Sequence, residues 1–94
     1  MTTSMSLDSA MGDLKRSLHQ TLVSRFGVKG DLNEDTGLFS SGLIDSLSVM
    51  DLVSFVEGEI GVTIRPNDIT LENFDSIGRI VRFAARQISG KDGP

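Results

Sequence analysis

Apolar residues recur at steps of three and four in three separate stretches of the chain, which is the spacing of one face of an amphipathic helix. The first stripe comprises Leu7, Met11, Leu14, Leu18, Leu22 and Phe26. Asp8 or Ser9 is expected to cap the start of this helix, and Gly27 is expected to end it.

The second and third stripes predict two further long helices. The second comprises Leu47, Met50, Val53, Val56 and Ile60, widened by Val49 and Leu52. The third comprises Ile77, Ile80, Val81, Ala84 and Ile88. Gly61 is expected to stop the second helix, and Gly90 follows the third. The shared core is expected to contain Leu14, Leu18, Val53, Val56, Ile80 and Ala84.

The connections between these stripes predict the rest of the architecture. Residues 66–74 are too short for a full helix and are expected to form one or two turns. Residues 62–64 resemble a strand but have no partner, so we interpret them as an extended connection. The loop at residues 27–45 is unusually long, and such loops are usually functional. Its expected anchors to the core are Leu32, Leu38, Phe39, Leu43 and Ile44.

Together these elements predict an all-α four-helix bundle, with three long helices, one short helix and the long loop between helices 1 and 2. The 94 residues are enough for a single domain, 1–94, with its core at about 7–89. Residues 1–6 and 91–94 are expected to be frayed ends.

Composition narrows the classes of function. The chain has no cysteine, which excludes disulfides, thiolate zinc sites and cysteine nucleophiles. It has one histidine, so we expect a binding or carrier module rather than an enzyme, with no metal site and no catalytic residues. Apolar runs are too short to span a membrane and no secretory signal is visible, so a cytoplasmic location is expected. A monomer is also expected. A net charge of −4 without Trp or Tyr disfavours nucleic-acid binding.

Charge is distributed unevenly along the chain. Residues 31–75 hold ten acidic residues and one basic residue, whereas both flanking segments are net basic. In a compact domain, this distribution favours one acidic side that is able to dock a basic partner.

Three weaker patterns are better explained without a site. Asp31, Asn33 and Asp35 suggest a calcium loop, but the glycine and glutamate that an EF-hand requires are missing, which favours a turn-rich loop. His19 lacks the partners of a catalytic group, so we interpret it as a surface histidine. Arginines at positions 79, 82 and 86 favour a solvated helix face, with contacts to the acidic middle.

The remaining pattern is the segment Gly42–Leu47, which closes the long loop and opens the second helix. Asp45 or Ser46 is expected to cap that helix. A serine at a loop–helix junction is accessible to a modifying enzyme, which a serine in the middle of a helix would not be.

The run LFSSGLIDSLSVMDLVSFVEGEIGVTI, together with the later ITLENFDSI, resembles acyl and peptidyl carrier proteins. The resemblance covers about residues 7–89 and implies a 4′-phosphopantetheine arm, delivered from coenzyme A, on Ser46. It implies that Asp45 helps to position the metal when the phosphopantetheinyl transferase acts. It also implies enzyme docking at Leu47, Met50, Asp51 and Glu57.

The resemblance implies a carrier that delivers thioester-bound groups between a loading ligase and downstream transferases. We expect a free-standing carrier, because no linker to a larger synthase is visible. Gly58 and the sparse acidic residues of the second helix depart from fatty-acid carriers, which favours an aminoacyl or short acyl cargo over a long acyl chain. The alternative is an unmodified helical interaction module of the same fold.

Overall fold

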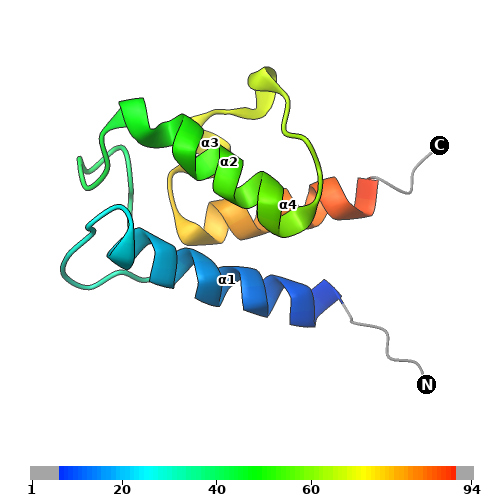
Figure 1. The fold of residues 1–94 in the computed structure, drawn as a ribbon, viewed down its shortest axis with the longest axis horizontal. Coiled ribbons are helices and arrows are strands. Elements are labelled where there is room, and N and C mark those ends of the chain that lie inside the picture. The colour runs from blue at the N-terminus through cyan, green and yellow to red at the C-terminus, as the bar shows by residue number, and fades with distance from the viewer. Residues whose placement is uncertain (1–6, 91–94) are drawn as a thin grey trace.

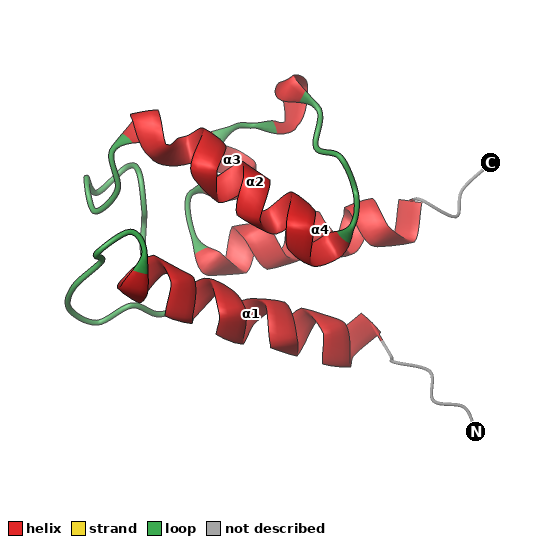
Figure 2. Cartoon of the chain, in the orientation of Figure 1, coloured by secondary structure: helices red, strands yellow, loops and turns green. Residues whose placement is uncertain are grey.

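The computed structural model describes residues 7–90, and in that range the chain is helical without strands (Figure 2). The α-helices are α1 (Leu7–Ser24), α2 (Val49–Ile60), α3 (Leu71–Phe74) and α4 (Ile77–Gly90). Two single 3₁₀ turns, η1 (Ser46–Ser48) and η2 (Pro66–Asp68), precede α2 and α3. The predicted all-α bundle of three long helices and one short helix is therefore confirmed. The predicted frayed ends lie outside the described residues.

Helix α4 packs against α1 and α3 and also contacts α2. The start of α1 and the end of α4 lie at one end of the molecule, and the loop between α1 and α2 lies at the other (Figure 1). The start of α2 is therefore placed at the loop end of the bundle.

One apolar core joins all four helices and the loop. All six predicted core residues are confirmed as buried, and the rings of Phe74 and Phe83 add a tilted contact with centroids 5.4 Å apart. The buried apolar residues are Leu14, Leu18, Leu22, Val28, Leu38, Ile44, Leu52, Val53, Val56, Ile64, Phe74, Ile77, Ile80, Phe83 and Ala84.

The predicted cap of the first helix is wrong. Because α1 begins at Leu7, Asp8 and Ser9 lie inside its first turn, whereas a cap must precede the first helical residue. The helix ends at Ser24, and the chain then turns at Gly27, whose φ of 70° is in the left-handed region that favours glycine. The N–H of Val28 donates to the Leu22 carbonyl at 3.0 Å and closes this turn.

The other helix ends agree more closely with the sequence. Gly61 caps α2 in the left-handed conformation, as predicted. Gly90 is the last residue of α4 rather than the residue after it, a shift of the size that fraying at helix ends produces. Residues 62–64 form no strand, which confirms the extended connection, and the segment 66–74 forms two separate turns.

Most of the predicted loop anchors are confirmed. Leu38 and Ile44 are buried, and Leu32 and Phe39 are partly buried against the core. The prediction for Leu43 is wrong, since this side chain is 37% exposed. Its neighbour Ile44 is buried in the core instead, so only one of these two consecutive side chains anchors this part of the loop.

The arginines of α4 are exposed, which confirms the solvated face. The Arg79 guanidinium donates to the Glu72 backbone carbonyl at 3.2 Å. The Arg86 guanidinium donates to Asn73 Oδ1 at 3.1 Å and lies over the Phe83 ring. None of the described helices has the length and apolar character needed to cross a membrane.

Candidate functional site: a serine at the start of the second helix

A tight turn in the long loop brings the chain to the surface just before α2. The N–H of Ile44 donates to the Leu38 carbonyl at 2.9 Å, and the N–H of Gly42 donates to the Phe39 carbonyl at 3.1 Å. Gly42 has a φ of 83°, which a side chain rarely tolerates. Because Ile44 is then buried in the core, the next residues emerge at the rim of the bundle.

Asp45 caps the helical segment that follows. Its backbone is extended, and its carboxylate accepts a hydrogen bond from the Leu47 N–H at 3.0 Å. Its carbonyl accepts a second bond, from the Ser48 N–H at 2.8 Å. The prediction that Asp45 or Ser46 caps the second helix is therefore only partly right. Asp45 caps the 3₁₀ turn η1 that leads into α2, and Ser46 is the first residue of that turn. The residue that precedes α2 itself is Ser48, whose side chain makes no capping hydrogen bond.

Capping by Asp45 leaves the neighbouring serine available. The Ser46 side chain is exposed, and its hydroxyl makes no hydrogen bond with residues 7–90. Ser48, two residues later, is half-buried. Ser46 therefore presents an oxygen nucleophile to solvent on a backbone that its neighbour holds in place.

Exposed apolar side chains lie on both sides of Ser46 in the sequence. Leu47 is 86% exposed, Met50 is 55% exposed and Leu43 is 37% exposed. Leu47 and Met50 were predicted as part of the apolar stripe, and in this respect the prediction is wrong. Leu47 lies in a 3₁₀ turn, which rotates more per residue than an α-helix, and Met50 lies at the edge of the buried face. We call Leu43, Leu47 and Met50 the apolar patch.

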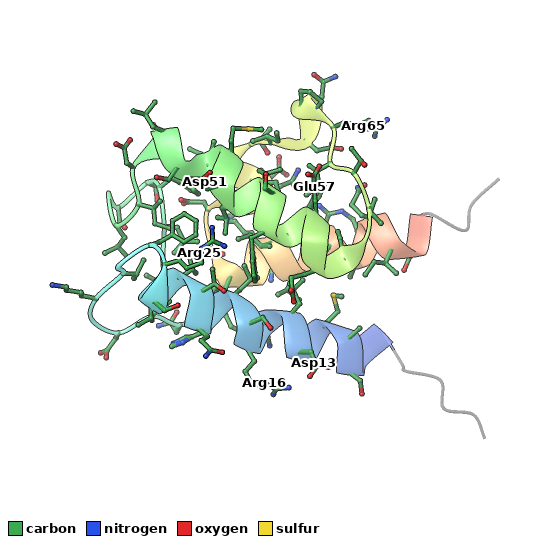
Figure 3. All side chains as sticks on the ribbon, in the orientation of Figure 1. Asp13, Arg16, Arg25, Asp51, Glu57 and Arg65 are labelled. Carbon is green, nitrogen blue, oxygen red and sulfur yellow. The ribbon has the colours of Figure 1, made fainter. Side chains whose placement is uncertain are left out.

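The two acidic residues predicted to dock enzymes differ in their surroundings. Asp51 is exposed in the first turn of α2. Glu57 is half-buried, and its Oε2 accepts a hydrogen bond from the Ile64 N–H at 2.7 Å, which ties α2 to the extended connection. Figure 3 shows Asp51 near the loop end of α2 and Glu57 further along the helix. The docking role of both residues stays a prediction.

A shallow pocket of about 290 Å³ lies beside the serine. Arg25, from the chain after α1, lines it together with Asp45, Ser48 and Asp51. Figure 3 shows Arg25 reaching from the end of α1 toward α2. The sequence patterns did not single out Arg25, and they assigned Leu43 to the core rather than to the surface near Ser46. Arg25 joins the site only through the turn of the chain after α1, which no local pattern predicts. The pocket lining is Arg25, Phe26, Leu43, Ile44, Asp45, Ser48 and Asp51.

A second pocket, of about 320 Å³, lies between the start of α1 and the ends of α2 and α4. It is at the opposite end of the bundle from Ser46. Its lining comes from Ala10, Met11, Asp13, Leu14, Glu59, Ile60 and Ile88.

The weaker sequence patterns have ordinary structural explanations. The Asn33 side chain accepts a hydrogen bond from the Asp35 N–H at 2.8 Å, and Thr36 Oγ1 accepts one from the Asn33 N–H at 3.0 Å, which confirms a turn-rich loop. His19 is exposed, as predicted. Within residues 7–90, no three histidine, aspartate or glutamate side chains gather as metal ligands would.

Comparison with known proteins identifies the family. A family model described as the phosphopantetheine attachment site matches residues 16–84, well over half of the chain. A search of curated proteins found no significant relative. Members of the matched family are carrier domains rather than catalysts. They bear a covalently attached 4′-phosphopantetheine and interact with modifying and acyl-handling enzymes. The chain therefore belongs to the phosphopantetheine-binding family of carrier proteins.

Proposed function

We propose that this protein holds an acyl or aminoacyl group as a thioester on a 4′-phosphopantetheine arm at Ser46 and delivers it to partner enzymes. The observation that carries the proposal is the exposed, unengaged Ser46 hydroxyl within the D-S-L sequence, at the junction of the loop and α2. A serine inside a helix or in the core would not reach the active site of a transferase.

The residues around Ser46 fit a phosphodiester. The hydroxyl is open to solvent, and Arg25 is a base that lines the adjacent pocket, which also contains the acids Asp45 and Asp51. A guanidinium is well suited to offset the added negative charge of a phosphate. Asp45 already has one carboxylate oxygen on the Leu47 N–H, and we propose that its carboxylate also helps to position the metal ion of the transferase.

Attachment is a phosphoryl transfer in which the Ser46 Oγ is the nucleophile. Its bond forms to the coenzyme A phosphorus nearest the pantetheine, adenosine 3′,5′-bisphosphate leaves, and the hydroxyl proton passes to the transferase. When bound, the arm supplies the thiol that forms thioesters. The chain has no cysteine of its own, so this thiol must come from the arm.

The apolar patch and Asp51 form the proposed docking surface for the transferase, the loading ligase and downstream transferases. Exposed apolar side chains beside a reactive group are typical of interaction sites, and the exposed Asp51 carboxylate adds attraction to basic partners. Glu57 is a weaker member of this surface, since its carboxylate is already bound to the Ile64 N–H.

An amino acid or short acyl group is the cargo that we propose. The side chains facing one another between α2 and α4 are closely packed: Val53 is 2% exposed, and Val56 and Ile80 are fully buried. Opening that interface for a long chain would cost contacts throughout the core. A long acyl chain that raises the melting temperature and shifts the amide signals of these three residues, when an aminoacyl group does not, would reverse this assignment.

Mass spectrometry tests the attachment. Apo protein incubated with coenzyme A, Mg²⁺ and a broad-specificity phosphopantetheinyl transferase is expected to gain one arm. The variant Ser46→Ala is expected to gain none, and the matched control Ser48→Ala is expected to gain one. Modification of Ser46→Ala would overturn the assignment. A wild-type protein that several transferases fail to modify would indicate the unmodified interaction module instead.

A further inference from the structure

Asp75, between α3 and α4, binds the loop that carries Ser46. Its Oδ1 accepts hydrogen bonds from the Phe39 N–H at 2.8 Å and the Ser40 N–H at 2.9 Å. Its Oδ2 accepts a third bond, from the Ser40 hydroxyl at 2.7 Å. One carboxylate thus joins two segments that lie 35 residues apart in the sequence.

Backbone hydrogen bonds reinforce this connection. The N–H of Leu38 donates to the Asp75 carbonyl at 2.6 Å, and the N–H of Gly78 donates to the Glu34 carbonyl at 2.9 Å. A Cβ atom at Gly78 would lie only 3.0 Å from the Glu34 oxygen, so glycine permits this close approach. Residues 34–40 are therefore held against the start of α4.

The electrostatics of Asp75 agree with this geometry. Partial burial opposes ionisation, but the hydrogen bonds from the Ser40 hydroxyl and from the Ser40 and Phe39 N–H groups outweigh it and hold the pKa of Asp75 below its ordinary value. The carboxylate is thus charged at neutral pH, and charge-assisted hydrogen bonds are stronger than neutral ones.

A short series of hydrogen bonds in the loop connects Asp75 to the residues just before Ser46. The segment that Asp75 binds is the same one whose Leu38 and Phe39 carbonyls accept the N–H groups of Ile44 and Gly42. Ile44 is then buried, and Ser46 follows two residues later. Loss of the Asp75 carboxylate would free the turn that precedes Ser46, which includes Leu43, whereas Leu47 and Met50 lie beyond that turn on η1 and α2.

We propose that Asp75 is a positioning residue for arm attachment: it holds the loop at residues 37–44 against the start of α4, so that Ser46 is presented in one orientation to the transferase. This proposal rests on the proposed role of Ser46. Misplacement of a nucleophile by about 1 Å can cost about 100-fold in rate. Docking is expected to persist, because Leu47, Met50 and Asp51 lie on η1 and α2, outside the segment that Asp75 binds, and only Leu43 lies within it.

Steady-state kinetics of modification test the proposal, with the carrier as the varied substrate. For Asp75→Ala we expect kcat to fall about tenfold to 100-fold, with little change in KM. The conservative variant Asp75→Asn keeps an oxygen that can accept both N–H groups, so it is expected to restore most of kcat. The control Glu72→Ala, which removes an exposed carboxylate three residues earlier, is expected to match the wild type.

Hydrogen exchange reports the structural part of the proposal. In Asp75→Ala, the amides of Phe39 and Ser40 are expected to lose protection, whereas the amides of α1 and α4 are expected to keep it. If Asp75→Ala does not fold, Ser40→Ala is used instead. It removes only the hydroxyl donor and is expected to lower kcat about threefold.

Three results would overturn the proposal. The first is an unchanged kcat in folded Asp75→Ala or, if that variant does not fold, in Ser40→Ala. The second is an equal decrease of kcat in Glu72→Ala, and the third is a change in KM without a change in kcat. Failure of the proposed function is seen separately, because the wild-type protein itself would then gain no arm.

Discussion

Two helices of this protein begin with the same dipeptide followed by an aliphatic residue, yet the two sites are opposite in character. Asp45–Ser46–Leu47 opens the segment that leads into α2, and there Ser46 is exposed and Leu47 is 86% exposed. Asp75–Ser76 precedes Ile77 at the start of α4, and there Ser76 is 4% exposed and Ile77 is 2% exposed.

The difference comes from which residue of the pair caps the helix. At the start of η1, the turn that leads into α2, the Asp45 carboxylate accepts the Leu47 N–H, which leaves the Ser46 hydroxyl without a structural role. At the start of α4 the Ser76 hydroxyl accepts the Arg79 N–H at 3.1 Å, because the Asp75 carboxylate is engaged by the loop. The hydrogen bonds of the aspartate therefore determine the role of the serine. Where the aspartate caps the helical segment, the serine hydroxyl is unused, and where the aspartate binds the loop, the serine becomes the cap.

Replacing each serine with alanine is expected to have very different effects on arm attachment. Ser46→Ala is expected to abolish arm attachment, whereas Ser76→Ala is expected to be fully modified at a temperature where it is folded. Intact mass after transferase treatment measures both. A similar decrease in arm attachment in the two variants would mean that attachment requires only an intact fold. The contrast between Ser46 and Ser76 would then say nothing about function.

Stability is expected to show the reverse order. Ser76→Ala removes a buried cap and is expected to lower the free energy of unfolding by about 1–2 kcal/mol. Ser46→Ala is expected to change it by less than about 0.5 kcal/mol, since the exposed hydroxyl makes no bond within the described chain. Urea denaturation of both variants gives the two values. The account requires the larger loss at Ser76.

Charge reversal near each Asp–Ser pair tests whether only the surface near Ser46 attracts the transferase. Asp51→Lys, beside Ser46, is expected to slow modification severalfold at low salt, and the effect is expected to shrink as ionic strength rises. Glu72→Lys, on α3 near Asp75, is the matched control and is expected to have little effect. Because Asp51 lies in the first turn of α2, its reversal is also expected to cost about 0.3–1 kcal/mol of stability.

Equal slowing in the two charge-reversal variants would point to net charge rather than to a defined docking surface. Circular dichroism of both variants verifies that any slowing comes from a folded protein.

The smallest expected effect concerns pH. The folded-state pKa of Asp75 is below its ordinary value of about 3.9, so its contribution to stability is complete above that value. The contribution is lost as the pH falls through the lower folded-state pKa. Because Asp75 is accessible to solvent, we expect less than about 1 kcal/mol. The free energy of unfolding, measured by denaturation at neutral and acidic pH, should therefore fall more in the wild type than in Asp75→Asn. Glu72→Gln is the control and is expected to behave like the wild type.

The sequence predicted the helices well, because long apolar stripes such as that of α4 identify their own buried face. It also indicated Ser46 as the candidate attachment site, since D-S-L occurs once, at the end of the long loop. It could not show that Leu47 is exposed, because the 3₁₀ turn departs from the α-helical period. The role of Asp75 depends on the path of a loop 35 residues away, which no local pattern contains.

The central claim is that Ser46, rather than any other serine, bears the arm. Cleavage of the modified protein before aspartates separates residues 45–50, with Ser46 and Ser48, from residues 35–44, with Ser40 and Ser41. It also separates them from residues 75–91, which contain Ser76. Tandem mass spectrometry of these peptides is expected to find the arm on 45–50 alone, with fragments that assign it to Ser46. An arm on 35–44 or on 75–91, or fragments that assign it to Ser48, would contradict the account.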